Sequence, residues 1–258
     1  MTELAGADIS SVPADLLAAV RAAERIVVFT GAGMSAESGL PTFRDEETGL
    51  WSRYDVSRLA TPEAWDADPA LVWAWYQRRR FQLAAVEPNP GHRAIAALGR
   101  HRRVDVVTQN VDDLHERGGS ERVVHLHGRL AETFCDTCRL PYPVPAVDPQ
   151  TEHLEPERCV CGGRIRPGVV WFGEHLPADE FARAVDHAEN CDLMLVVGTS
   201  GIVYPAAGLP QVAREHGATV AEINPNRTDL SEAADLVWRA PASTALPALL
   251  EVLSGTAS

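Results

Sequence analysis

The sequence lacks a long hydrophobic run: no stretch of about 18 consecutive apolar residues occurs, which excludes a membrane-spanning helix. The opening segment, MTELAGADIS, has no basic region followed by an apolar one, so we expect no secretory signal. Positive charge is also scarce, because 23 Lys and Arg face 36 Asp and Glu, for a formal net charge of −13. Sequence-independent binding to nucleic acid requires the opposite sign, so we expect no nucleic-acid partner.

Cysteine is scarce as well. Five cysteines are too few for a disulfide scaffold in 258 residues, and an odd number cannot all pair. Four of them lie between Cys135 and Cys161, and the fifth, Cys191, is interpreted as a small buried side chain. This distribution favours a metal site in a reducing compartment, and we expect a cytoplasmic protein.

The remaining composition is that of an ordinary globular protein, with 45% hydrophobic and 23% charged residues. The length fits one large domain, or one domain that carries a sizeable insertion. Short β-branched runs predict buried strands at residues 25–30, 104–108, 123–126, 169–172, 193–199, 219–223 and 235–238. Helical spacing occurs between them, over residues 15–23, 60–85, 92–98 and 211–216. This alternation predicts an α/β fold with a Rossmann-like, doubly wound parallel sheet.

Residues 131–165 have a different character. They contain the cysteine pairs and many prolines, and they show no long apolar periodicity. So little core predicts a small inserted module that needs a metal ion to fold.

Small or polar residues follow three of the predicted strands, at the edge where doubly wound sheets bind ligands. The groups are Thr30-Gly31-Ala32-Gly33, Thr108-Gln109-Asn110 and Gly198-Thr199-Ser200. The first is a Gly-x-Gly turn, where the absent side chains let the backbone approach a pyrophosphate. Ala36 stands where the third glycine of the dinucleotide fingerprint would fall, and no lysine follows, which excludes a phosphate-cradling NTPase loop. These residues leave cofactor binding and an ordinary tight turn both open.

The clustered cysteines form two pairs. Cys135 and Cys138 have Cys-x-x-Cys spacing, whereas Cys159 and Cys161 have the shorter Cys-x-Cys spacing. Four thiolates complete the tetrahedral shell of Zn²⁺, so the set predicts one structural zinc ion rather than a catalytic one. Two disulfides are the alternative, and the missing secretory signal argues against them.

A histidine near the end of a predicted strand is the candidate catalytic residue. Of His125 and His127, His127 is nearer to the following loop and stands beside Gly128. A structural role and a catalytic role both remain open for it on the residues alone.

These motifs, in this order, resemble the sirtuin family. The resemblance is carried by residues 31–44, 108–112, 127–128, 170–174 and 198–200, by Asn224 and by the two cysteine pairs, and it spans roughly residues 14 to 250. More closely, the sequence is similar to the class III subgroup (desuccinylase and demalonylase type), which removes acidic acyl groups from lysine.

The resemblance implies NAD-dependent deacylation of protein lysine. NAD would be a consumed co-substrate, and the products would be nicotinamide and O-acyl-ADP-ribose. His127 would be the general base, because a neutral imidazole suits proton transfer near neutral pH. The residues that would bind NAD are Gly31, Ala32, Gly33, Ser35, Phe43, Arg44, Gln109, Asn110, Asp112, Gly198, Thr199, Ser200, Asn224 and Ala242.

The resemblance also implies one catalytic domain over residues 8–254. Its large Rossmann lobe would comprise residues 14–48, 91–130 and 166–254. Its small lobe would comprise a helical insertion at 49–90 and the zinc module at 131–165.

Acyl specificity is implied by two residues of the helical insertion. Tyr76 and Arg79 are three positions apart, so they share a helix face, and a phenol with a guanidinium there can bind a carboxylate. In the subgroup this pair binds the distal carboxylate of malonyl, succinyl or glutaryl lysine. The small Ala60 leaves room for that acyl chain. An acetyl group is expected to bind less well. An aromatic core stripe beside a solvated arginine run is the alternative interpretation.

The resemblance implies that the substrate is acylated lysine in a protein or peptide. The peptide would pair as an added strand along Val170, Phe172, Gly173 and Glu174. We expect no membrane partner, and the sequence implies no oligomer. A hydride-transfer oxidoreductase, a non-catalytic zinc-binding adaptor and a mono-ADP-ribosyl transferase share parts of the pattern and remain alternatives.

Overall fold

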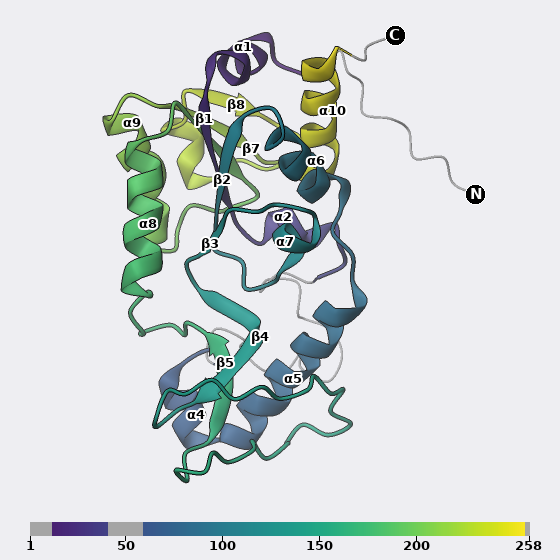
Figure 1. Cartoon of the computed structure of the whole chain (residues 1–258), viewed down its shortest axis with the longest axis vertical. Helices are drawn as coiled ribbons and strands as arrows, with labels where there is room; N and C mark the ends of the chain where they lie inside the picture. The colour runs from purple at the N-terminus through teal and green to yellow at the C-terminus, as the bar shows by residue number, and fades with distance from the viewer. Residues whose placement is uncertain (1–11, 41–58, 256–258) are drawn as a thin grey trace, which may run out of the picture.

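The computed structural model describes residues 12–40 and 59–255. Its larger part is built on a six-stranded sheet in the order β3-β2-β1-β6-β7-β8, and every neighbouring pair is parallel. The strands are β1 (Arg25–Thr30), β2 (Arg103–Thr108), β3 (Val123–His125), β6 (Leu193–Val197), β7 (Thr219–Ile223) and β8 (Leu236–Trp238). This order confirms the predicted Rossmann-like doubly wound sheet, and it reverses direction between β1 and β6 (Figure 1).

Helices cover both faces of this sheet. The helices α1 (Ala14–Ala22), α6 (Pro90–Leu98) and α10 (Ala242–Ser254) pack on one face, and α8 (Ala178–Glu189) and α9 (Leu209–Glu215) pack on the other. Along β1, Ile26 and Val28 belong to the first core and Val27 and Phe29 to the second, as the alternation of side chains along a strand requires. The short helices α2 (Gly33–Ala36) and α7 (Leu114–Arg117) follow β1 and β2.

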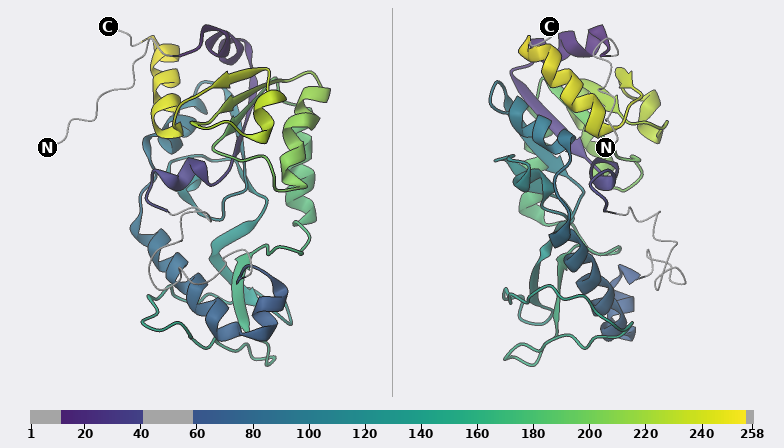
Figure 2. Two further views of the ribbon diagram at one scale, coloured as in Figure 1. Left: turned by 180° about the vertical axis from the view of Figure 1, so that it is seen from behind. Right: turned by 90° about the vertical axis from the view of Figure 1, so that its right-hand side faces the viewer.

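The small lobe lies at the other end of an elongated molecule (Figure 2). It consists of α4 (Pro62–Ala67), α5 (Pro69–Ala85), residues 136–164 and an antiparallel pair, β4 (Gly128–Cys135) with β5 (Ile165–Val169). Its core contains three buried tryptophans of α4 and α5 and a fourth from the chain after β5, namely Trp65, Trp73, Trp75 and Trp171.

The helical pattern expected over residues 60–85 is divided at Asp68. Its carboxylate accepts a hydrogen bond from Leu71 N at 3.0 Å and so caps α5, while Thr61 caps α4 in the same way. Proline occupies the first position of both helices, where no hydrogen-bond donor is needed.

The strand expected at 169–172 is displaced toward the N-terminus, because β5 ends at Val169 and pairs with β4 instead of joining the parallel sheet. The predicted lobe boundaries at 130/131 and 165/166 therefore fall inside β4 and at the start of β5, and those boundaries remain a prediction. The sequence patterns did not indicate α8 or α10. The four-residue helices α2 and α7 also lie outside the predicted helical segments.

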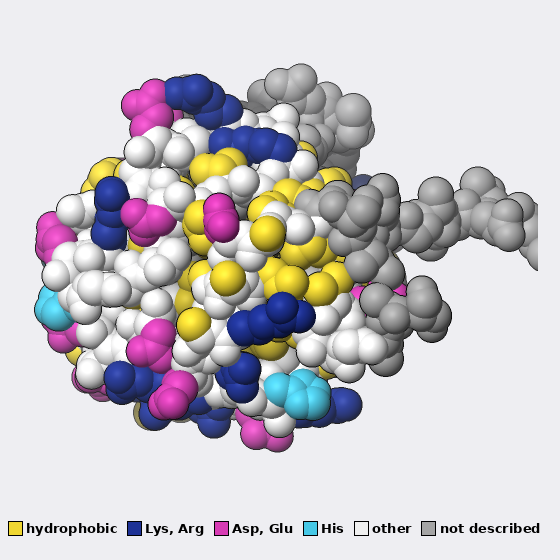
Figure 3. Space-filling model, turned by 90° about the horizontal axis from the view of Figure 1, so that it is seen from above, with side chains coloured by type: hydrophobic (Ala, Val, Ile, Leu, Met, Phe, Trp, Pro, Cys, Tyr) yellow, Lys and Arg dark blue, Asp and Glu magenta, His cyan; other side chains and the backbone are white. Residues whose placement is uncertain are grey.

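Among the described residues, no helix combines the length and the apolar character that a membrane crossing requires. The end of the molecule that carries α1 and α10 is shown from above in Figure 3, where arginine and acidic side chains are interspersed around a group of hydrophobic ones. This mixed face shows no concentration of positive charge.

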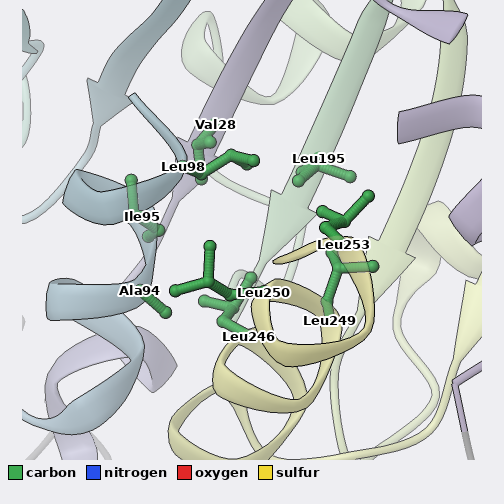
Figure 4. A pocket seen from close by; sticks show the side chains of 9 residues that line it. All are labelled: Val28, Ala94, Ile95, Leu98, Leu195, Leu246, Leu249, Leu250 and Leu253. Atoms are coloured by element: carbon green, nitrogen blue, oxygen red, sulfur yellow. The ribbon is translucent and has the colours of Figure 1, made fainter. Parts of the chain in front are cut away.

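The core between the sheet, α6 and α10 is closely packed. Figure 4 shows Leu246 and Leu250 of α10 on the side of α6 and Leu249 and Leu253 on the side of Leu195, around a void of only about 10 Å³. This space is too small and too apolar for a ligand.

Candidate active site

The carboxyl ends of four neighbouring strands are joined by polar side chains. The Thr30 hydroxyl donates to Thr108 Oγ1 at 2.8 Å, which ties β1 to β2. Gln109 Nε2 donates to Thr199 Oγ1 at 2.9 Å, and Asn224 Nδ2 donates to Thr199 O at 3.1 Å, which connects β2, β6 and β7. The polar groups predicted to share one edge of the sheet therefore do so, at the point where the strand order reverses.

The Gly-x-Gly turn packs directly against the loop after β6. Gly33 N donates to Gly198 O at 2.8 Å. A Cβ atom at Gly31 would lie 2.7 Å from Thr199 Cβ, and one at Gly33 would lie 2.8 Å from Gly198 O. Both glycines are thus required by the close approach of two protein segments, a reason that the sequence pattern alone did not identify.

A buried network lies beneath this turn. Asn110 Nδ2 donates to Gly31 O at 3.0 Å and to Ser35 Oγ at 3.2 Å, and the Ser35 hydroxyl donates to Asp112 Oδ2 at 2.8 Å. Burial raises the pKa of Asp112, and the hydrogen bonds from Ser35 and Leu114 N oppose that effect. Ser35, Asn110 and Asp112, three of the residues expected to bind NAD, thus form one connected unit.

His127 lies in the turn between β3 and β4, next to this network. Its Nδ1 donates to Gln109 O at 2.9 Å, so the neutral ring has its lone pair on Nε2. Burial lowers its pKa, partly offset by the bond to Gln109. Its own carbonyl accepts from Val170 N at 2.8 Å, which joins the chain after β5 to this turn.

Tyr76 and Arg79 come from α5. The Tyr76 hydroxyl oxygen accepts a hydrogen bond from Trp171 Nε1 at 2.9 Å in a buried setting. Arg79 stacks over Trp75 at 5.3 Å, and burial lowers its pKa to about 10, with the charge of Asp112 acting in the opposite direction.

The remaining residues expected to contact substrate lie around Trp171. Phe172 N donates to the carbonyl of the buried Ala60 at 2.9 Å, and the Phe172 side chain is 50% exposed. Gly173 has a φ of +88°, which a side chain would strain. The carboxylate of Glu174 accepts two hydrogen bonds from Arg166, at 2.7 and 2.9 Å, so Glu174 anchors this turn to β5.

The four clustered cysteines are brought together as predicted. Their sulfur atoms all lie within 4.8 Å of one another, with Cys135 and Cys161 at 3.4 Å and Cys138 and Cys159 at 3.7 Å. A tetrahedron with Zn–S bonds of about 2.3 Å has sulfur separations of about 3.8 Å, so this set fits a zinc ion. Gly163 is held close to the site, since a Cβ there would lie 2.6 Å from Cys135 Sγ.

Three further positions complete the expected set. Ser200 is half-buried in the loop after β6, and Ala242 is the buried first residue of α10. Phe43 and Arg44 lie outside the described residues. Sequence reasoning missed His115 and set His125 aside in favour of His127. His115 Nε2 lies 3.0 Å from Thr30 Oγ1, and His125 contacts Asn110 O. The signal that could have found them is their place in the sequence: His115 follows the strand-end group at 108–110, and His125 lies in the strand predicted at 123–126.

The chain is similar to characterised proteins over almost its whole length. The model of the Sir2 family matches residues 31–205. A protein of Mycolicibacterium paratuberculosis named NAD-dependent protein deacylase is 53% identical over 231 residues, covering 89% of this chain and 98% of that protein. NAD-dependent protein deacylase 1 of Pseudomonas aeruginosa is 53% identical over 242 residues, covering 92% and 96% respectively.

Solved structures agree with this result. The crystal structure of a Sir2 homolog–NAD complex superimposes with a TM-score of 0.87 at 40% identity and covers 99% of this chain and 98% of its own. A Sir2 variant in complex with a deacetylated p53 peptide and 3′-O-acetyl-ADP-ribose gives a TM-score of 0.81 at 30% identity, covering 95% and 98%. By sequence and by fold, this chain belongs to the Sir2 family.

Proposed function

We propose that this chain is an NAD-dependent protein lysine deacylase that prefers succinyl, malonyl and glutaryl groups to acetyl. The deacylase activity is supported by relatives of that name at 53% identity and by the strand-end site at the switch point of the sheet. The products would be nicotinamide, the free lysine and O-acyl-ADP-ribose.

His127 is the general base in this proposal. Its Nδ1 proton is committed to Gln109 O, so Nε2 is the atom that can take a proton, and burial keeps the ring neutral near pH 7. It would accept the proton of a ribose hydroxyl as that oxygen attacks the acyl carbon. The backbone bond between His127 and Val170 joins the turn that carries this base to the segment proposed to pair with the substrate peptide.

The residues at the strand ends fit a dinucleotide. Gly31, Gly33, Ser35, Gln109 and Asn110 converge from β1 and β2, and Gly198, Thr199, Ser200 and Asn224 converge from β6 and β7. Bound NAD would supply the ribose carbon that loses nicotinamide and receives the acyl oxygen. Asp112 and Asn110 would lie toward the nicotinamide, with Asn224, Ser200 and Ala242 toward the adenosine.

The proposed preference for acidic acyl groups rests first on Tyr76. Its hydroxyl oxygen already accepts from Trp171 Nε1, so its own hydrogen is free to donate to a carboxylate. Arg79 lies one helical turn further on, where burial disfavours its charge, and an anionic acyl chain would offset that cost. An acetyl group would leave both donors without this partner.

The four cysteines would hold a structural zinc ion. Zinc would supply a cross-link between β4 and the segment before β5, and four thiolates would leave it no open position for catalysis. We also infer a cytoplasmic location, where reducing conditions keep these thiolates available.

Mass spectrometry of the products tests the proposal. The chain is incubated with NAD and matched acetyl-, succinyl- and glutaryl-lysine peptides, and we expect nicotinamide and O-acyl-ADP-ribose, formed faster from the two acidic substrates. Reduced-cofactor absorbance without nicotinamide release would instead indicate an oxidoreductase. Ribose label transferred from NAD to protein would indicate an ADP-ribosyl transferase, and equal rates on all three peptides would contradict the acyl preference.

A further inference from the structure

His125 stands two residues before the proposed general base but has different surroundings. It is the last residue of β3 and is 3% exposed. Its Nδ1 lies 3.0 Å from the backbone oxygen of Asn110, and its Nε2 lies 2.8 Å from Glu116 Oε1 on α7. The ring thus bridges a helix and the turn that follows β2.

Both partners of the ring are acceptors. A backbone carbonyl has no proton to give, so Nδ1 must donate to Asn110 O. Burial alone would raise the pKa of Glu116, but the hydrogen bond and charge of His125, together with Arg129, lower it to about 2. The carboxylate is therefore ionised and is an acceptor for Nε2 of the ring.

Asn110 is the residue that this contact fixes. Its backbone N–H donates to Thr108 Oγ1 at 3.0 Å, its Nδ2 donates to Gly31 O, and its carbonyl accepts from His125. Among the residues that the structure describes, no hydrogen bond reaches Asn110 Oδ1. The backbone and one side-chain atom are thus held from three directions, while the amide oxygen is left for a ligand.

Two consecutive carbonyls of the turn after β2 are held by histidines. His127 donates to Gln109 O and His125 donates to Asn110 O, at 2.9 and 3.0 Å. The Glu116 carboxylate holds Nε2 of His125, whereas Nε2 of His127 is the atom proposed to take a proton. The environments assign the two rings different tasks.

We propose that His125 is a positioning residue for NAD: by holding the Asn110 carbonyl, it aims the Asn110 amide oxygen at the nicotinamide end of the site. It does not touch the ligand. This inference rests on the proposed function, because it takes NAD to be the ligand at these strand ends.

Two substitutions separate the two contacts of the ring. In His125→Asn, the amide nitrogen takes the place of Nδ1 and retains the bond to Asn110 O. In His125→Gln, the longer side chain puts its amide in the place of Nε2, which retains Glu116 but leaves Asn110 O without its donor. Both variants replace a buried polar ring by a buried amide, so each is the control for the other.

NAD affinity measured by calorimetry, with steady-state kinetics alongside, is the readout. We expect His125→Gln to raise the Kd and the KM for NAD about tenfold, the effect of losing one buried hydrogen bond. His125→Asn should stay within about twofold of the wild type. The KM for the acyl peptide should not change in either variant. Should His125→Gln fail to fold, Glu116→Ala removes the partner that holds the ring and should raise the Kd about threefold.

The outcomes separate this inference from the proposed function. Equal NAD affinity in both variants and the wild type overturns the positioning role and leaves the deacylase intact. A wild type that binds NAD but converts no acyl peptide overturns the deacylase, while the ratio of the two variant affinities still decides the role of His125. A wild type that does not bind NAD overturns both.

Discussion

The indole nitrogen of Trp171 donates to the hydroxyl oxygen of Tyr76 at 2.9 Å, so a tryptophan beside the segment proposed to bind the peptide sets the direction of the Tyr76 proton. This contact joins the proposed acyl pocket on α5 to the chain after β5. Any change in the acyl pocket is therefore expected to alter recognition of the acyl group without altering the glycine turn or the zinc cluster.

Replacement of Arg79 by Met should separate acidic from neutral acyl substrates. Met keeps the apolar stem but cannot pair with a carboxylate, and the loss of a charged hydrogen bond of about 1.5–3 kcal/mol should lower kcat/KM for a succinyl peptide by about 10- to 100-fold. The kcat/KM for the acetyl peptide should remain within about threefold, since the acetyl group has no carboxylate to lose. Arg78→Met is the matched control one position away, at a half-buried arginine that lies 4.0 Å from Asp148. Equal losses of kcat/KM on both peptides would contradict the proposal that Arg79 binds the acyl carboxylate.

Proton transfer through His127 predicts a particular pH dependence. The neutral ring is the active form, and burial lowers its pKa below the ordinary value of 6.5. The kcat/KM should therefore be constant around neutral pH and fall only as the pH drops through a midpoint below 6.5. A midpoint at or above the ordinary value would contradict a buried neutral base. His127→Ala should remove this acidic limb together with the activity.

Zinc should stabilise the small lobe rather than take part in the reaction. Cys159→Ser removes one of four ligands, and we expect loss of bound zinc and a lower thermal midpoint by calorimetry. The buried Cys191, distant from the cluster in sequence, supplies the control: Cys191→Ser should retain one zinc per chain by elemental analysis. A Cys159→Ser protein that still holds stoichiometric zinc would show that the ligand set is different.

The parallel sheet was predictable because β-branched runs such as Arg25–Thr30 and Leu193–Val197 leave few alternatives to buried strands. The cysteine cluster was also predictable, because two closely spaced cysteine pairs supply the four thiolates that one zinc ion requires. The boundary near Val169 was not, because β5 pairs with β4, and apolar residues give no sign of which strand will be the neighbour. The helix α8 was also missed, since it buries only Ala184 and Ala188, whose small side chains give a weak apolar signal.

Parts of the site became evident only from contacts. The Gly31 and Gly33 pattern left a ligand site and an ordinary tight turn both open, whereas the structure gives both glycines a packing reason in Gly198 and Thr199. The bond from His125 to the Asn110 carbonyl involves a backbone atom, so the residue types alone could not predict it. Sequence motifs marked the residues at the strand ends, and the structure was needed to identify what holds them.

The composition leads to a prediction about self-modification. All 23 basic residues of this chain are arginine, so no lysine is available for acylation. After incubation with succinyl-CoA, intact mass spectrometry should show no lysine adduct, and the deacylase activity should be unchanged. The exposed Arg100→Lys variant, placed after α6, should gain one succinyl group under the same conditions. Inactivation of the wild type by succinyl-CoA, at unchanged binding of NAD, would contradict this resistance.

Acid should destabilise the large lobe through two buried histidines. His92 and His115 stack edge to face at 4.9 Å, and within the described part of the chain the ring nitrogens of His92 and Nδ1 of His115 have no hydrogen-bond partner. Burial lowers the pKa of His92 to about 4 and that of His115 to about 3. An unfolded chain binds protons on both rings below the ordinary value of 6.5, whereas the folded chain does not until about pH 4.

The free energy of unfolding should therefore be highest above pH 6.5 and should fall as the pH decreases from 6.5 toward 4. Two such groups give a slope of up to about 2.7 kcal/mol per pH unit, from about 1.36 kcal/mol for each. Urea titrations at pH 7, 6 and 5 measure this slope. His92→Leu should make it shallower, because one proton-binding group is lost from the unfolded chain, while His101→Leu, at an exposed histidine, is the control. A slope that is the same in the wild type and in His92→Leu would show that His92 does not contribute to acid sensitivity.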